Sequence, residues 1–150
     1  MAVWSIQPAH IRHINRLANR MREVDRVECL ATGRHPKQAL RHCLNGSTLA
    51  WTVLKDAKPV GMFGVLPLSI IEGRGAPWFL GTDELLTGAR QWIKWGPGFV
   101  EAMQGDFPRL QNIVAIDNHR AIRVLKALGF AVSTETVIVG GVAMVRFSKG

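Results

Sequence analysis

The sequence predicts a single α/β domain of the α+β kind, with a central mixed, mostly antiparallel sheet, flanking helices and a C-terminal β-hairpin. Three observations predict it. A buried strand, a helix and another strand follow one another over residues 110–130. Two pairs of β-rich runs, over residues 48–66 and 134–147, are each joined by a short polar or glycine turn. The 150 residues suit one ordinary domain and show no linker or repeat.

The N-terminal third is predicted to be one strand followed by helices. Pro8 suits the start of a helix, because proline is tolerated in the first turn. Gly33 can end a helix, and Pro36 can begin the next one. The expected elements are a strand over residues 3–7 and helices over residues 10–21, 22–31 and 36–44.

The middle of the chain is predicted to be a hairpin, a short strand and an interrupted helix. Gly61 and Gly64 inside the second hairpin strand indicate a bend or a close backbone approach. Thr82 can cap the helix that follows the short strand, and Gly96-Pro97-Gly98 should break that helix. The expected strands cover residues 48–54, 60–66 and 76–81, the hairpin loop residues 55–59, and the second helical piece residues 99–104.

The unit over residues 110–130 has the clearest local signals. Asn118 can cap the helix that follows the strand, because its side chain can accept a hydrogen bond from the first turn. Ala121 and Leu125 belong to an apolar stripe at helical spacing. Gly129 can end the helix in the left-handed conformation, so the unit reads strand, capped helix, glycine stop, strand.

The formal net charge of +8 favours polyanions or acidic partners. Arg12, Arg16 and Arg20 stand four residues apart on the polar side of the first predicted helix. Like charges at this spacing repel one another, so the row is either solvated or meets an anion.

Cys29 and Cys43 lack the spacing of a redox pair or a metal site, so we expect reduced, buried thiols in a cytosolic protein and no metal. The most apolar run, residues 60–71, is shorter than the ~20 residues of a membrane helix. No charged and then apolar leader opens the chain. These observations predict a soluble protein without membrane contact.

Three motifs and the order of the elements resemble the GNAT superfamily of N-acetyltransferases. The motifs are Pro59-Val60-Gly61, Asn118-x-x-Ala121 and Gly129-Phe130. The resemblance implies a sheet that splays between residues 78–82 and 110–116, with acetyl-CoA in the gap. Asn118 would then lie near the acyl donor, as an alternative to its capping role. If acetyl-CoA binds, the implied contacts are Phe79, Leu80, Gly81, Thr82, Asn118 and Ala121.

Two departures from the family's pattern weigh against catalysis. The family's Gln/Arg-x-x-Gly-x-Gly/Ala pyrophosphate loop is missing, and Asp83 and Glu84 would place two carboxylates where the phosphates settle. Leu125 stands where many of these enzymes carry a tyrosine general acid, and the chain contains no tyrosine. No catalytic residue is singled out, and no cofactor is expected unless the chain is an active transferase. The candidate general bases are Glu72, Asp83, Glu84 and Asp117.

Within this superfamily the chain resembles most specifically the internal core, or inner virion, proteins of short-tailed autographivirus phages. The resemblance is carried by segments 25–29, 77–83 and 118–130. This resemblance implies a non-catalytic role in virion morphogenesis. The implied partners are virion or assembly proteins, and the implied locations are the host cytoplasm and the virion interior. Non-specific contact with packaged DNA would be compatible with the positive charge.

Two other functions stay open. The first is an acetyl-CoA-dependent N-acetyltransferase with an atypical pyrophosphate loop, which predicts saturable binding of acetyl-CoA. The second is a nucleic-acid binder that uses the arginine row and rings such as Trp92 and Trp95. The chain carries no helix-turn-helix, OB or finger signature. The sequence indicates neither an acceptor substrate nor an oligomeric state.

Overall fold

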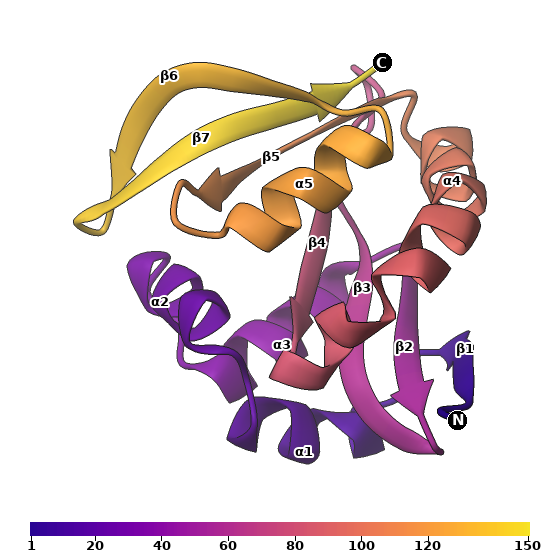
Figure 1. Cartoon of the computed structure of the whole chain (residues 1–150). Coiled ribbons are helices and arrows are strands. Elements are labelled where there is room, and N and C mark those ends of the chain that lie inside the picture. Colours follow the sequence, from indigo (N-terminus) through magenta and orange to yellow (C-terminus); the bar gives the residue numbers. More distant parts are fainter.

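The computed structural model describes residues 1–150 and places a seven-stranded sheet between two groups of helices (Figure 1). The strand order is β1-β2-β3-β4-β5-β7-β6. All neighbouring strands are antiparallel except β4 and β5, so the predicted mixed, mostly antiparallel fold is confirmed. None of the helices combines the length and the apolar composition that a membrane span requires. The elements are β1 (Trp4–Pro8), η1 (Ile11–His13, a 3-10 helix), α1 (Ile14–Asn19), α2 (Glu23–Ala31), α3 (Pro36–Gly46), β2 (Leu49–Lys55), β3 (Lys58–Ser69), β4 (Arg74–Gly81), η2 (Asp83–Gly88, a 3-10 helix), α4 (Ala89–Asp106), β5 (Arg109–Ala115), α5 (His119–Ala127), β6 (Ala131–Val139) and β7 (Val142–Lys149).

Both predicted hairpins are confirmed. Asp56 and Ala57, at φ of 50° and 65°, form the turn between β2 and β3, so the loop is shorter than residues 55–59. Gly140 and Gly141, at φ of 55° and 81°, form the turn between β6 and β7. Positive φ at both central residues matches the right-handed twist of the flanking strands. These local turns set the register of four of the seven strands.

The sheet opens between its two parallel strands. β4 and β5 pair only at Arg74 with Arg109 and at Gly75 with Leu110. Beyond these pairs β4 continues to Gly81 and β5 to Ala115 without a ladder between them. The two strands therefore form a V whose open end lies at their C-terminal ends, and the predicted splay is confirmed.

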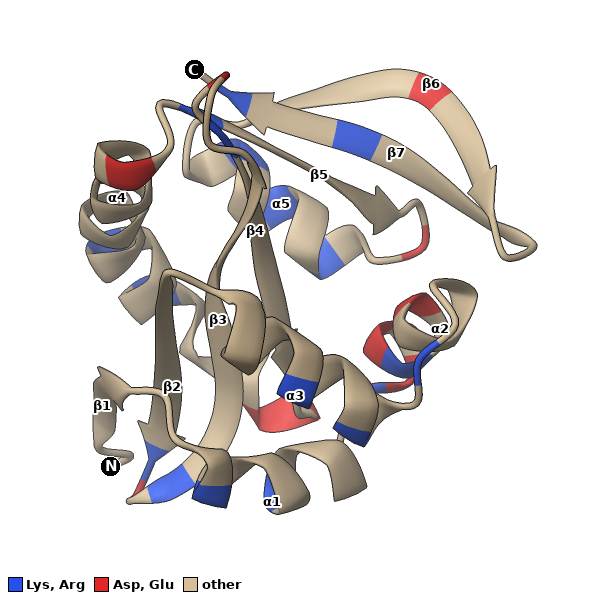
Figure 2. Cartoon of the chain, turned by 180° about the vertical axis from the view of Figure 1, so that it is seen from behind, with Lys and Arg blue, Asp and Glu red and all other residues tan.

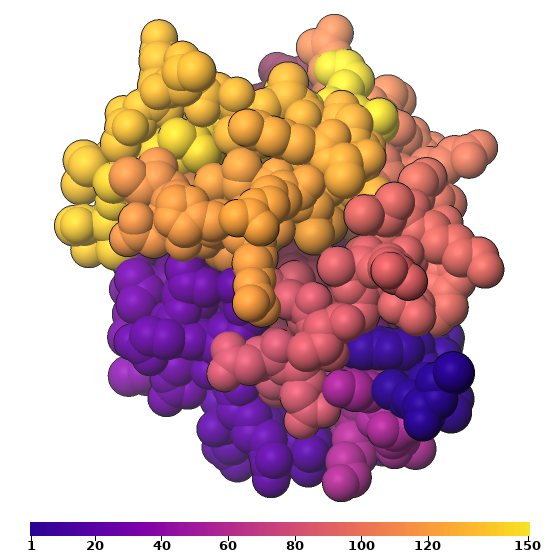
Figure 3. Space-filling model, viewed as in Figure 1, coloured from indigo at the N-terminus to yellow at the C-terminus, as the bar shows by residue number.

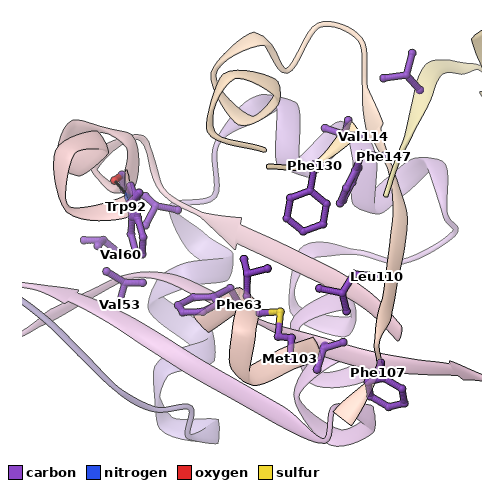
Figure 4. Close-up of a cluster of buried hydrophobic side chains, with 14 residues drawn as sticks. Val53, Val60, Phe63, Trp92, Met103, Phe107, Leu110, Val114, Phe130 and Phe147 are labelled. Atoms are coloured by element: carbon purple, nitrogen blue, oxygen red, sulfur yellow. Dashed lines mark hydrogen bonds between the residues drawn. The ribbon is translucent and has the colours of Figure 1, made fainter. Parts of the chain in front are cut away.

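Each face of the sheet has its own core. Phe63 and Phe79 point to the face of α4 and α5, where Trp92, Phe130 and Phe147 are also buried. Figure 4 shows Phe130 beside Phe147, whose ring centroids are 5.5 Å apart. The next residues along the same strands point to the opposite face, because side chains alternate along a strand. That second core consists of Ile14, Leu17, Ala18, Met21, Cys29, Ala39, Leu40, Met62, Trp78 and Leu80.

The first helical segment differs from the prediction. Pro8 is the last residue of the edge strand β1, where it pairs with Trp51, and does not start a helix. The helix expected over residues 10–21 is split into η1 and α1, and Met21 forms an isolated bridge with Thr82. Helix α1 ends at Asn19, before this bridge, because Met21 must be extended to pair with Thr82 beyond the end of β4. The positions of α2 and α3 agree with the sequence.

Helix α4 is continuous, although the sequence predicts a break at Gly96-Pro97-Gly98. Trp92 and Val100 are both buried and anchor the turns on either side of the proline. Gly96 packs closely against Leu128, just after α5, where a Cβ would come within 2.4 Å of a leucine methyl. This tertiary packing outweighs the hydrogen bond that Pro97 cannot donate.

Candidate functional site

A cavity of about 420 Å³ lies in the V between β4 and β5. Phe63 and Phe79 line it from the face of α4 and α5, whereas Leu66 and Trp78 line it from the face of α3. Since one cavity touches side chains on both faces, it passes through the sheet where the ladder is missing. On the outer side α4 and α5 lie side by side (Figure 3) and both contribute to its wall. The size is that of a pocket for a small molecule.

Helix α5 presents its apolar stripe to this cavity. None of its residues is fully buried, and Ala121, Val124 and Leu125 line the cavity. The apolar stripe predicted from the sequence is confirmed: Leu125 is half-buried, packs against the core on the α4–α5 face and also lines the cavity. Of the six residues that the resemblance implies, Phe79, Leu80, Asn118 and Ala121 line the cavity, whereas Gly81 and Thr82 do not.

Residues Arg22, Asp25, Glu28 and Asn118 form a buried polar group, here called the α2 cluster. One guanidinium nitrogen of Arg22 lies 3.2 Å from Asp25 Oδ1, and the other donates to Asn118 Oδ1 at 3.0 Å. Asn118 Nδ2 donates to Glu28 Oε1 at 3.2 Å. The sequence predicts that the Asn118 side chain caps α5, and this prediction is wrong. The side chain makes no capping hydrogen bond, because it is bound to two side chains of the N-terminal segment.

The α2 cluster holds the two arms of the V. The backbone N–H of Gly81, the last residue of β4, donates to Asp25 Oδ2 at 3.0 Å. The backbone N–H of Ala115, the last residue of β5, donates to Glu28 Oε1 at 2.9 Å. These amide groups lack ladder partners at the open end, and two carboxylates of one helix satisfy them. The α2 cluster thus bridges the open end of the sheet.

Burial dominates the acid–base properties of both carboxylates. Desolvation raises the pKa of Asp25 to about 7, against the opposing effect of the Arg22 guanidinium. Desolvation also raises the pKa of Glu28, and the hydrogen bonds from Ala115 and Asn118 oppose it. Glu28 is the only carboxylate that lines the cavity. A carboxylate with a raised pKa beside a binding cavity is suited to accept a proton near neutral pH.

The candidate bases named from the sequence do not lie at the cavity. Glu72 pairs with Arg74, and Glu84 lies 3.9 Å from Lys55 at the surface. Asp83 and Asp117 are exposed and do not line the cavity. Sequence reasoning missed Glu28, although Arg22, Asp25 and Glu28 at three-residue spacing on one helical face are a signal for a polar cluster.

The segment after β4 also differs from the prediction. Thr82 makes no capping hydrogen bond, and Asp83 and Glu84 begin the 3-10 helix η2. The α-helix begins later, at Ala89, with Gly88 before it and no acidic residue in its first turn. The N-terminus of α4 is therefore not occupied by carboxylates, and no side chain caps it. Leu86 and Trp92, on either side of this N-terminus, both line the cavity.

Replacing Leu125 with tyrosine tests which way this side chain faces. Because Leu125 borders the cavity, we expect the larger ring to enter open space and to change the free energy of unfolding by less than about 1 kcal/mol. Leu110→Tyr is the matched control, since Leu110 is 1 % exposed and does not line the cavity. There we expect a loss of about 1–3 kcal/mol from overpacking. Urea unfolding of both variants gives the comparison, and equal losses would contradict the orientation of Leu125.

The basic row of the sequence spans two consecutive helical segments. Arg12 lies in η1, Arg16 in α1 and Arg20 at the end of α1. None of the three forms an ion pair with a carboxylate. Trp92 is buried and donates its indole N–H to the Leu85 carbonyl at 3.0 Å. This ring is a core residue and not a stacking platform for bases.

The sequence matches no protein-family model and no curated protein. Among solved structures, a ribosomal-protein-alanine N-acetyltransferase from Brucella melitensis is similar at a TM-score of 0.70 and 15% identity, over 97% of this chain and 98% of that one. AAC(6')-Ib, an aminoglycoside acetyltransferase in complex with ribostamycin and coenzyme A, has a TM-score of 0.66 and 16% identity, over 97% and 92%. An acetyltransferase of the GNAT family from Streptococcus pneumoniae has a TM-score of 0.59 and 13% identity, over 98% of both chains. These likenesses show that the chain has the GNAT acetyltransferase fold.

Proposed function

We propose that this GNAT-fold chain binds acetyl-CoA in the cavity between β4 and β5 and transfers the acetyl group to an amine. The observation that carries the proposal is the cavity itself, which stays open through the sheet at the place where the fold separates its strands. Similar structures with the same fold include one in complex with coenzyme A and an aminoglycoside. The alternative drawn from the sequence is thus the function that we adopt.

Different residues around the cavity would bind the cofactor and accept the proton. The first backbone N–H groups of α4, beside Arg90, would hold the anionic phosphates of the cofactor. The apolar walls from Phe79, Ala121 and Leu125 would surround its uncharged arm. When bound, the cofactor supplies an acyl thioester. Glu28 would accept the proton that the amine loses as its nitrogen bonds to the acyl carbon.

The virion-assembly role receives no support from the features described. The sequence suggested this role through the resemblance of segments 25–29, 77–83 and 118–130 to phage core proteins, and none of the similar structures named above is such a protein. The blocked cofactor site that agreed with it is not seen, because Asp83 and Glu84 lie in η2, before the N-terminus of α4. The cavity is open and of small-molecule size. For these reasons we place the transferase first and treat partners in a virion as a separate question.

Calorimetric titration with acetyl-CoA at physiological salt tests the proposal. We expect saturable one-to-one binding to the wild-type chain, because a specific site survives the screening that weakens general attraction to a +8 protein. Ala121→Trp should weaken binding by roughly tenfold or more, since its ring would fill the cavity. Ala127→Trp is the matched control, because Ala127 is on the same helix, exposed and outside the cavity. Absence of saturable binding, or equal binding to both variants, would contradict the proposal.

A further inference from the structure

The part of the cavity that faces α2 and α3 is mostly apolar, with Thr32, Arg34 and His42 as its polar lining, and has no role in holding the cofactor in the function proposed above. Its walls include Cys29 from α2, Ala39 and Cys43 from α3, and Leu66 and Trp78 from the sheet. The indole N–H of Trp78 donates to Ser47 at 2.7 Å, so the ring offers only its apolar surface to the cavity. This half of the cavity suits the hydrocarbon part of a ligand.

One guanidinium group lines this half of the cavity. Gly33, at φ of 86°, reverses the chain after α2, and the backbone N–H of Arg34 then donates to the Cys29 carbonyl at 3.1 Å. This turn brings Arg34 back to the cavity, where it is half-buried. Its positive charge acts on the neighbouring Cys43 thiol and opposes the burial that raises the pKa of that thiol to about 11. The guanidinium therefore lies beside the cavity wall.

Arg34 has no anionic partner in the chain. The three ion pairs of the structure involve other residues, and its side chain makes no hydrogen bond. Helix α3 beside it carries Lys37 and Arg41 and no acidic residue (Figure 2). Glu28, the only carboxylate of the cavity, is bound to Ala115 and Asn118. An unpaired guanidinium at the edge of an apolar cavity is suited to a carboxylate, which it can bind through two parallel hydrogen bonds.

We propose that the α2–α3 half of the cavity binds an apolar molecule that ends in a carboxylate, with the carboxylate on Arg34 and the hydrocarbon chain against Cys43, Leu66 and Trp78. This inference deepens the proposed function. The carboxylate site is argued from the cavity and Arg34 alone, whereas the class of acyl acceptor rests on the proposed function. The acyl acceptor is then an amine whose other end is a carboxylate, such as an ω-amino alkanoate. Its amino end approaches Glu28, and its nitrogen forms an amide with the acyl group while the donor leaves as a thiol.

Titration calorimetry with octanoate, without acetyl-CoA, tests the carboxylate site. We expect octanoate to bind the wild-type chain roughly tenfold or more tightly than 1-octanol, because only octanoate can pair with Arg34. Arg34→Gln should remove this preference and leave the affinity for 1-octanol unchanged. Arg34→Lys should keep part of it, since lysine retains the charge but not the forked geometry. Arg41→Gln is the matched control, because Arg41 is a neighbouring, exposed cation outside the cavity.

Equal binding of octanoate and 1-octanol to the wild-type chain would overturn the carboxylate site. So would an octanoate affinity that Arg34→Gln and Arg41→Gln reduce alike. A second measurement, acetylation of 8-aminooctanoate against octylamine, tests the acceptor class, and equal rates would overturn it. Failure of the proposed function is recognised separately: octanoate would still bind through Arg34, whereas acetyl-CoA would not bind at all.

Discussion

Asp25→Ala is expected to lower the free energy of unfolding by about 3–5 kcal/mol at pH 8, where the carboxylate is ionised. Asp25 is 1 % exposed and is the partner of both Arg22 and the Gly81 amide. Alanine would leave a buried guanidinium without its carboxylate and a buried N–H without an acceptor. Urea unfolding measures the loss. Removal of the same bonds should also loosen the end of β4, so acetyl-CoA binding should weaken at temperatures where the variant is still folded.

Two controls separate this effect from a general loss of charge. Asp83→Ala removes an exposed carboxylate with no ion pair and should change stability by less than about 0.5 kcal/mol. Asp25→Asn keeps an acceptor for Gly81 and should cost less than Asp25→Ala. If Asp25→Ala and Asp83→Ala cost the same, the α2 cluster does not hold the open end of the sheet.

The pKa of Asp25 also predicts the direction of a pH effect. Its pKa is about 7 in the folded chain and about 4 in an unfolded one. Between these values the folded state binds a proton that the unfolded state does not, so stability rises as the pH falls from 8 towards 4. Glu28, whose pKa is also raised, acts in the same direction. Asp25→Asn should flatten this part of the profile, and an unchanged slope would contradict the assignment.

Glu28→Gln is expected to reduce the rate of acetyl transfer by roughly 10²–10⁴-fold while acetyl-CoA binding stays the same. Glutamine can still accept the hydrogen bonds from Ala115 and Asn118 but cannot take a proton from the amine. Release of CoA with 8-aminooctanoate as acceptor gives the rate, and calorimetry gives the affinity for the cofactor. A variant with the full rate would exclude Glu28 as the base.

Glu72→Gln is the matched control for this experiment. Glu72 is an exposed carboxylate that pairs with Arg74 and lies outside the cavity, so its replacement should leave the rate unchanged. If both variants lost activity equally, the cause would be the change in net charge and not a proton acceptor in the cavity. The pH profile adds a readout that a merely structural role would not produce: in the wild-type chain the rate should fall at low pH as Glu28 becomes protonated.

Local chemistry explains which elements the sequence predicts correctly. The turns at Gly140-Gly141 and the helix stop at Gly129, whose φ is 89°, depend on a residue that can adopt a positive φ. The α5 stripe depends only on helical spacing. Where a distant segment competes, local signals mislead. Asn118 has the chemistry of a helix cap, but Arg22, 96 residues earlier, and Glu28, 90 residues earlier, take its side chain.

The sequence by itself determined the α+β class, both hairpins and the glycine-terminated helix, and the family resemblance implied that Asn118 and Ala121 lie beside the splayed strands. Only the tertiary structure decided that Glu28 lies at the cavity, that α4 continues through Pro97, and that the acidic residues 83 and 84 leave the N-terminus of α4 free. The reason is the range of the interactions. Turns and periodicity act between neighbours in the chain, whereas the amides of Gly81 and Ala115 lack sheet partners and are satisfied by α2, a helix 56 and 87 residues away from them in sequence.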